Sequence, residues 1–202
     1  MSDPGVPVVE WSGSAQPDVR LVVMLHGWGE TETEMTALVP SLPPGPAYAS
    51  LRAPYFQGRH RAWFTKGQPF TTTAGWFEDW LDSIHAYERP IVLVGFSAGA
   101  AFAGGVLLLN PRRYLGAAIL SGTLPFDAGV ETPTDRLIGK SVLLVHNTAD
   151  AMIPPELLDR AWRYLTGDSG ACTHALRFEG GHGISEQAVA ALGHWLDEVL
   201  VK

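Results

Sequence analysis

A single serine stands between two glycines in the segment Gly95-Phe96-Ser97-Ala98-Gly99. The segment follows the apolar run 91–94 and precedes an alanine-rich stretch, which predicts a turn from a strand into a helix. Glycines on both sides of such a turn let the strand and the helix approach closely, so that the Ser97 hydroxyl is presented as a nucleophile. The same pentapeptide also occurs as a simple tight turn, so other residues have to decide between the two interpretations.

An aspartate and a histidine follow two other runs of strand length. Asp150 comes after the apolar run 142–145, and His182 lies between glycines after the run 175–178. A serine hydroxyl is a poor nucleophile until a base takes its proton, and His182 is the candidate base. Asp150 is the candidate acid that holds the imidazole in the reactive tautomer. The chain order Ser, Asp, His is that of the α/β-hydrolase arrangement.

Attack by Ser97 on a carbonyl would create a negatively charged oxygen that needs two backbone N–H donors, an oxyanion hole. One donor is expected from Ala98, which follows the nucleophile at the start of a predicted helix. The other is expected from Trp28, in the loop after the predicted strand 19–25. The sequence therefore predicts a complete set of groups for acyl transfer.

Other residues compete for the same roles. Asp127 and Asp135 are alternative acids, but neither follows a strand directly. His146 ends the strand before Asp150, where a core histidine bonded to the backbone is the favoured interpretation. His174 lies at the start of the last predicted strand and His194 inside the last predicted helix, so both are at the wrong ends of their elements to act as the base. Cys172 precedes that strand and has no base partner in view, so a structural role is expected for it.

The framework for these residues is an alternation of strands and helices. Strands are predicted over 19–25, 47–51, 91–94, 117–120, 142–145 and 175–178, with an edge strand over 6–11. Helices are predicted over 33–42, 72–87, 98–109, 155–165 and 185–200, and loops over 53–70 and 122–140. Buried strands interleaved with helices indicate an α/β fold with a mostly parallel sheet, helices on both faces and little or no lid. Sites in such sheets gather at the carboxyl ends of the strands.

The composition restricts the function further. With 202 residues and 46% hydrophobic content, the chain is expected to form one globular domain over 1–202. A net charge of −7 argues against nucleic acid as a partner, and no apolar run is long enough for a membrane span. No secretory signal pattern is visible and the single cysteine cannot form an internal disulfide, so a cytoplasmic location is expected. No Cys/His cluster indicates a metal, and no cofactor is expected.

The sequence resembles the phospholipase/carboxylesterase family of α/β-hydrolases, small serine esterases that include acyl-protein thioesterases. The matching stretches are LVVMLHGWGETETE, IVLVGFSAGAAFAGGVLL, GAAILSGTLP, SVLLVHNTADAMIPPELL and GGHGISEQAVAALGHWL. The resemblance implies that Ser97 is the nucleophile, Asp150 the triad acid and His182 the base. It also implies that the oxyanion hole is formed by Trp28 and Ala98.

The chain departs from the family pattern at three places. Many relatives have glutamine where this chain has Ala98, although the backbone donor survives the change. Relatives often have His-Gly before the acid and Asp-Pro at it, whereas this chain has His146-Asn147 and Asp150-Ala151. Trp28 replaces a smaller apolar residue, which leads to the hypothesis that the acyl pocket is narrowed and that short acyl chains are favoured.

The sequence thus predicts a serine carboxylesterase that acts on small esters through an acyl-enzyme. The pocket is expected to be lined from the loops near Ser97, by Trp63, Phe64, Leu124, Met152 and Ile153. The same machinery acting on a thioester or a lysophospholipid is the main alternative, and a non-catalytic ligand-binding protein with this scaffold is a weaker one. A homodimer is compatible with the sequence.

Overall fold

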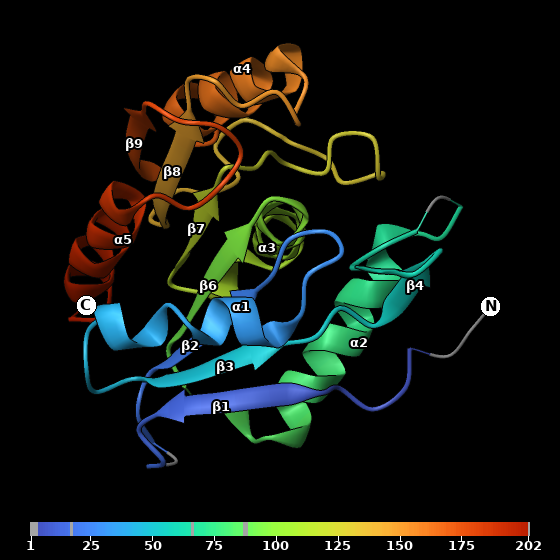
Figure 1. Cartoon of the computed structure of the whole chain (residues 1–202), viewed down its shortest axis with the longest axis vertical. Helices are drawn as coiled ribbons and strands as arrows, with labels where there is room; N and C mark the ends of the chain where they lie inside the picture. Colours follow the sequence, from blue (N-terminus) through green and yellow to red (C-terminus); the bar gives the residue numbers. More distant parts are fainter. Residues whose placement is uncertain (1–3, 17, 66, 87–88, 202) are drawn as a thin grey trace.

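A computed structural model describes residues 4–16, 18–65, 67–86 and 89–201 (Figure 1). Seven strands form the central sheet in the order β1-β3-β2-β6-β7-β8-β9. All neighbouring pairs are parallel except β1 and β3, which are antiparallel, so the predicted mostly parallel sheet is confirmed. In spatial order the strands are β1 Val9–Gly13, β3 Ala47–Leu51, β2 Leu21–Leu25, β6 Ile91–Phe96, β7 Gly116–Leu120, β8 Ser141–Asn147 and β9 Cys172–Phe178.

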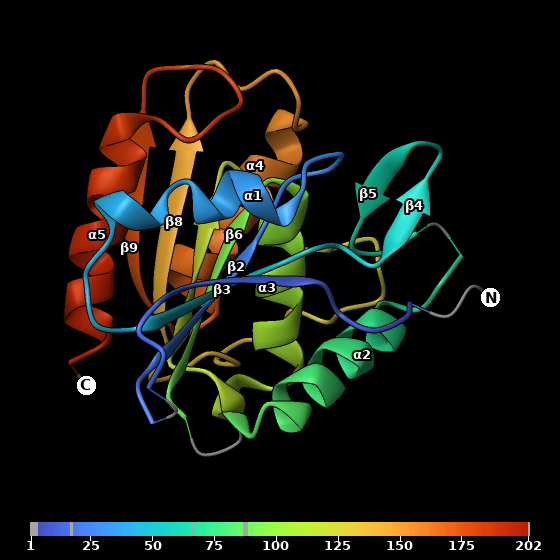
Figure 2. The same cartoon turned by 60° about the horizontal axis from the view of Figure 1, so that its bottom comes forward.

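Helices cover both faces of this sheet (Figure 2). The helices are α1 Glu32–Thr36, α2 Phe70–Ser83, α3 Ala98–Leu109, α4 Pro155–Arg163 and α5 Glu186–Val199. Side chains of α2, α3 and α4 pack into one core cluster, whereas side chains of α1 and α5 pack into the other. The predicted helix 72–87 starts two residues earlier, at Phe70, and its predicted end is wrong, because α2 ends at Ser83 and His85 has a non-helical φ of 53°. Tyr87 itself lies outside the described residues.

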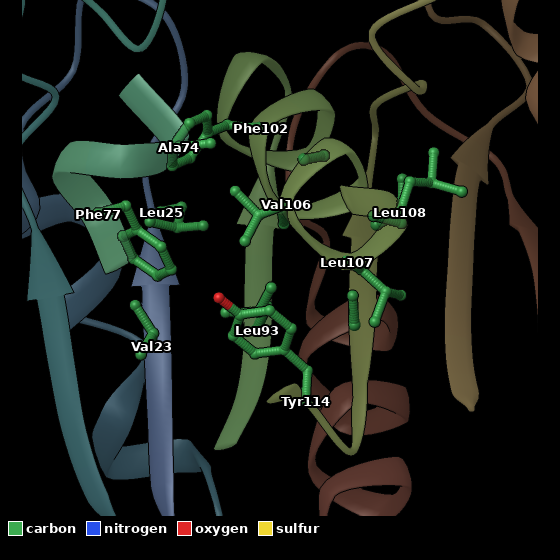
Figure 3. Close-up of a cluster of buried hydrophobic side chains, with 14 of the residues drawn as sticks. Val23, Leu25, Ala74, Phe77, Leu93, Phe102, Val106, Leu107, Leu108 and Tyr114 are labelled. Carbon is green, nitrogen blue, oxygen red and sulfur yellow. The ribbon is translucent and has the colours of Figure 1, made fainter. Parts of the chain in front are cut away.

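The central strands divide their side chains between the two clusters. On β2, Val23 and Leu25 face the α2 and α3 side, while Val22 and Met24 face the α1 and α5 side. This is the two-residue period of a strand, and all four side chains are fully buried because both faces are covered. Figure 3 shows Val23, Leu25 and Leu93 against the side chains of α2 and α3. The result is a rigid sheet whose carboxyl ends meet at one rim.

The region 53–70 was predicted as a loop but contains a small hairpin. Strands β4 Tyr55–Gln57 and β5 His60–Ala62 pair antiparallel, and the hairpin stands beside the loop that follows β2 (Figure 2). Strands of three residues are too short to produce a recognisable alternating pattern in the sequence. The predicted loop 122–140 has no helix or strand, and Leu124, Val130 and Leu137 anchor it in the core. No helix among the described residues combines the length and the apolar character that a bilayer crossing requires.

Candidate active site

The turn at Ser97 has the strained geometry of a nucleophile elbow. Ser97 has a φ of 53° and a ψ of −112°, outside the regions that ordinary residues favour, and its N–H donates to Leu120 O at 3.0 Å. A Cβ at Gly95 would lie 2.3 Å from Gly99 O, and a Cβ at Gly99 would lie 2.0 Å from Leu25 O. Both glycines are therefore required for the close approach of α3 to β6 and β2. The turn leaves Ser97 half-buried at the rim of the sheet.

The loops after β8 and β9 bring the predicted acid and base to this serine. His182 Nε2 lies 2.8 Å from Ser97 Oγ, and His182 Nδ1 lies 2.8 Å from Asp150 Oδ2. These are hydrogen-bond distances, although His182 is 85 residues from Ser97 and 32 residues from Asp150 in the sequence. The structure thus brings together all three residues that the sequence singled out.

The surroundings of Asp150 keep it ionised. Its side chain is only 1% exposed, and its Oδ1 accepts the N–H of Met152 at 2.9 Å and that of Ile153 at 3.4 Å. Burial alone would raise the pKa of Asp150, but the hydrogen bonds from His182 and from these amides outweigh it and lower the pKa below its ordinary value. A carboxylate at this place accepts the Nδ1 proton of His182, which leaves Nε2 as the acceptor for the Ser97 hydroxyl.

The loop after β2 is held by a chain of hydrogen bonds. His26 is fully buried, and its Nε2 accepts the N–H of Ala53 at 3.0 Å, so the ring proton is on Nδ1 and is donated to Gly27 O at 2.7 Å. Burial lowers the pKa of His26, which keeps this ring neutral. The N–H of Gly27 donates to Glu30 Oε2 at 2.8 Å, and burial raises the pKa of Glu30. Four residues of two loops therefore fix the backbone on both sides of Trp28.

The hairpin completes this restraint. The N–H of Gly29 donates to Arg61 O at 3.0 Å, and the half-exposed Trp28 ring lies on His60 with 4.2 Å between ring centroids. The N–H groups of Trp28 and Ala98 have no hydrogen-bond partner among the residues that the structure describes. Two free donors on restrained backbone segments are what an oxyanion hole requires.

Comparison with known proteins identifies the family of the chain. The sequence profile of the phospholipase/carboxylesterase family matches residues 71–200, well over half of the chain. The chain belongs to this family. It is 26% identical to a probable inactive carboxylesterase of Oryza sativa subsp. japonica, over 95% of this chain and 89% of that protein. It is also 26% identical to acyl-protein thioesterase 1 of Eremothecium gossypii, over 86% of this chain and 85% of that protein.

The structure is similar to the crystal structure of the Bacillus cereus carboxylesterase, with a TM-score of 0.82 and 19% identity over 96% of this chain and 94% of that one. The α/β-hydrolase fold predicted from the sequence is therefore confirmed. Membership of the phospholipase/carboxylesterase family makes the chain a carboxylic-ester hydrolase of the carboxylesterase or thioesterase type.

A mostly apolar cavity of about 450 Å³ lies beside α3. It is lined by Ala101, which is one helical turn after Ser97. Its walls include Phe64 and Leu124, two of the residues expected to line the substrate pocket, together with Ala101, Phe126 and Leu157. The polar side chains of Gln57, Gln68 and Asp127 also line it. A larger hollow of about 620 Å³ is lined by Pro43–Pro46 and Leu200. That hollow lies at the amino ends of β2, β3 and β6, away from Ser97 at the carboxyl end of β6.

The pocket prediction is wrong for Trp63. Its side chain is only 1% exposed, stacks on Phe102 with 4.9 Å between ring centroids, and donates its indole N–H to His26 O at 2.8 Å. It is therefore part of the core and supports the loop that carries Trp28. Met152 is 72% exposed and Ile153 is half-buried, and neither lines the cavity beside α3.

The competing residues lie elsewhere. His146 is buried and contacts Gly122 O through Nε2 at 3.0 Å, which confirms the expected core histidine, and burial lowers its pKa. His194 lies on the surface with its Nε2 3.3 Å from Glu198 Oε1. Cys172 is the exposed first residue of β9, and Asp127 is at the wall of the cavity rather than next to His182. No cluster of potential metal ligands is present in the part of the chain that the structure describes.

Sequence reasoning missed two polar residues near the site. Ser121 follows β7 with a φ of 43°, and Asn147 ends β8; both side chains are buried and both contact the loop that carries His182. The sequence held two signals: Ser121 directly follows the predicted strand 117–120, and Asn147 departs from the His-Gly of the family. Neither signal indicates which loop these side chains contact.

Proposed function

We propose that the protein hydrolyses small carboxylic esters through an acyl-enzyme on Ser97. The observation that carries the proposal is the continuous chain of 2.8 Å contacts from Ser97 Oγ through the His182 ring to Asp150 Oδ2. In the first half-reaction, His182 Nε2 takes the hydroxyl proton while Ser97 Oγ attacks the carbonyl carbon. The tetrahedral intermediate collapses when His182 returns that proton to the leaving alcohol.

In the second half-reaction, water takes the place of the alcohol. His182 Nε2 removes a proton from the water, which attacks the acyl carbon, and the proton then passes to Ser97 Oγ as the acid leaves. The Asp150 carboxylate stabilises the imidazolium that forms in each step. The amides of Trp28 and Ala98 donate to the carbonyl oxygen as it becomes negative, and one such donor is worth about 10²–10³ in rate.

The apolar cavity beside α3 is proposed to receive the acyl chain. Its volume of about 450 Å³ suits a small ligand. Its walls are mostly apolar, which favours a hydrocarbon chain, and Asp127 in the wall disfavours an anionic group. Short acyl chains are proposed as the preferred substrates because this volume is in the lower half of the range of about 300–1,000 Å³ for ligand pockets. The hypothesis that Trp28 narrows the pocket is wrong, because its ring rests on His60 and is not part of the cavity wall.

Steady-state rates on p-nitrophenyl esters from acetyl to decanoyl test the proposal. The wild type is expected to hydrolyse the short esters fastest, and Ser97→Ala is expected to lose about 10⁶-fold in kcat, the loss known for removal of a triad serine. A maximum at decanoyl would contradict the short-chain proposal alone. Equal rates for the wild type and Ser97→Ala would contradict the mechanism.

Thioester hydrolysis is the second candidate, because one relative is named an acyl-protein thioesterase. The same triad and the same cavity would serve a thioester. Values of kcat/KM on butyryl p-nitrophenyl ester and on butyryl-CoA decide between the two, with a higher value on the oxygen ester expected here. The name of the rice relative includes the word inactive. The full set of Ser97, Asp150 and His182 supports catalysis in this chain.

A further inference from the structure

The loop that carries His182 has little intrinsic rigidity. It connects β9 to α5 over residues 179–185, and three of its residues next to His182 are glycines: Gly180, Gly181 and Gly183. Glycine loses more conformational freedom on ordering than any other residue, so this segment needs external restraints to hold an imidazole in place. The hydrogen bond to Asp150 fixes the tip of the ring but not the backbone from which the ring projects.

Asn147 supplies such a restraint on both sides of His182. Its Nδ2 donates to Gly181 O at 2.7 Å and to Gly183 O at 2.9 Å, which uses both amide protons on the carbonyls that flank the base. Asn147 is only 6% exposed, so these bonds do not compete with bulk water. Asn147 is the last residue of β8, a strand that is paired on both sides, with β7 and β9.

The orientation of this amide is determined by its neighbours. If the Asn147 side chain were rotated by 180°, its Oδ1 would face two carbonyl oxygens, and both contacts would become repulsive. In the observed orientation Oδ1 is buried without a hydrogen-bond partner among the described residues. The two bonds from Nδ2 therefore outweigh the cost of leaving Oδ1 without a partner. An aspartate has no side-chain donor when ionised, so it could not hydrogen-bond these two carbonyl oxygens.

Ser121 supports the same loop from the adjacent strand end. Its Oγ donates to Gly183 O at 2.7 Å and lies 3.1 Å from Asn147 Nδ2. Ser121 has a φ of 43°, a strained value for a residue with a side chain, and its N–H donates to Val145 O at 2.8 Å. This strained residue thus bonds the next strand through its backbone and the His182 loop through its hydroxyl.

We propose that Asn147 and Ser121 form a clamp that positions His182 by holding the carbonyls of Gly181 and Gly183. This inference rests on the proposed function of His182 as the base. Asn147 is then the main positioning residue and Ser121 the second, and neither contacts the Ser97 hydroxyl. Because a displacement of about 1 Å at a reacting group can cost about 10²-fold, loosening the clamp is expected to reduce kcat by about 10- to 100-fold.

The test compares Asn147→Ala, Ser121→Ala, the double variant and Ser169→Ala with the wild type. Ser169 is the matched control, since it is a fully buried serine that hydrogen-bonds Leu165 O at the other end of β9. With p-nitrophenyl acetate, Asn147→Ala is expected to lower kcat and kcat/KM by the same factor and to leave KM unchanged, which marks an effect on the transition state. Ser121→Ala is expected to lose about 3- to 10-fold, and the double variant less than the product of the two losses.

A second readout does not depend on turnover. The proton that His182 Nδ1 donates to Asp150 gives a low-field resonance in one-dimensional NMR, which is expected in the wild type and in Ser169→Ala and is expected to broaden or vanish in Asn147→Ala. Thermal melts identify a variant that does not fold. If Asn147→Ala does not fold, the kcat of Ser121→Ala decides whether the clamp positions His182.

Folded Asn147→Ala and Ser121→Ala variants with wild-type kcat and an intact resonance would overturn the clamp. So would an equal loss of kcat in Ser169→Ala, because the effect would then follow any buried polar deletion. A wild-type protein without esterase activity that still shows the resonance, and loses it in Asn147→Ala, would overturn the proposed function and leave the positioning of His182 supported.

Discussion

Replacing Gly99 by alanine tests the link between packing and catalysis. The added Cβ would lie 2.0 Å from Leu25 O and 2.6 Å from His26 O, whereas ordinary contacts begin at 3.4 Å. Both obstructing atoms are backbone atoms at the carboxyl end of a strand that is paired on both sides, so they cannot move aside as a flexible side chain would. The start of α3 has to shift away from β2 by about 1 Å or more.

The size of the effect follows from this displacement. Overpacking of a core typically costs about 1–3 kcal/mol, and a clash with backbone is expected at the upper end of that range. For a chain of this length, a loss of about 3 kcal/mol lowers Tm by about 6–12 °C. The shift also separates the Ala98 amide from the loop that carries Trp28, so kcat on p-nitrophenyl butyrate is expected to fall by about 10²-fold at a temperature where the variant is folded.

Gly75→Ala is the matched control. Gly75 lies on the exposed side of α2, where an added Cβ meets no atom within 4 Å. Alanine is favoured over glycine inside a helix by about 1 kcal/mol, so Tm is expected to rise by about 2–4 °C with unchanged kcat. Differential scanning calorimetry and steady-state kinetics on both variants are sufficient. Wild-type Tm and kcat in Gly99→Ala would refute the close-approach argument.

Three further results are expected. Asp150→Asn is expected to lower kcat by about 10⁴-fold with little change in secondary structure by circular dichroism, because the amide stabilises the wrong tautomer of His182; a loss of less than tenfold would contradict this role. Because the pKa of Asp150 is lowered in the folded state, its ionised form stabilises the fold fully above about pH 4, and this stabilisation is lost as pH falls through the folded pKa. The Tm of the wild type should therefore fall more steeply below about pH 4 than the Tm of Asp150→Asn. Parallel curves of Tm against pH would count against a lowered pKa. Arg52→Met is expected to lower the free energy of unfolding in urea by about 1–3 kcal/mol, because the Glu32 side chain, 7% exposed, loses its partner. The loss is kept below that of a fully buried pair because Arg52 is itself one-third exposed. An unchanged urea midpoint would show that the pair contributes nothing.

Much of the framework could be predicted from local patterns. The predicted bounds of α3 and β3 agree with the structure, since each is a largely apolar segment with clear ends: Ser97 and Asn110-Pro111 for α3, and Pro46 and Pro54 near the ends of β3. The meeting of Ser97 and His182 could be predicted as well, because parallel strands bring their carboxyl ends to one rim.

Other features depend on tertiary contacts that leave no local pattern. Strand β9 begins three residues before its predicted start because pairing with β8 extends it to Cys172, which pairs with Ser141. Trp63 was assigned to the pocket because it lies in a loop, but its ring stacks on Phe102 from a distant helix. The contacts of Asn147 depend on the path of a loop more than thirty residues further along the chain, which no spacing rule specifies.

The nucleophilicity of Ser97 is the central claim, and labelling with a fluorophosphonate followed by peptide mass spectrometry tests it most directly. The reagent needs a serine hydroxyl that an adjacent base can deprotonate, and the 2.8 Å contact with His182 Nε2 provides one. We expect a single modified peptide that contains Ser97, slow labelling in His182→Ala and no labelling in Ser97→Ala. A folded wild-type protein that remains unlabelled, or is labelled equally in Ser97→Ala, would contradict the account.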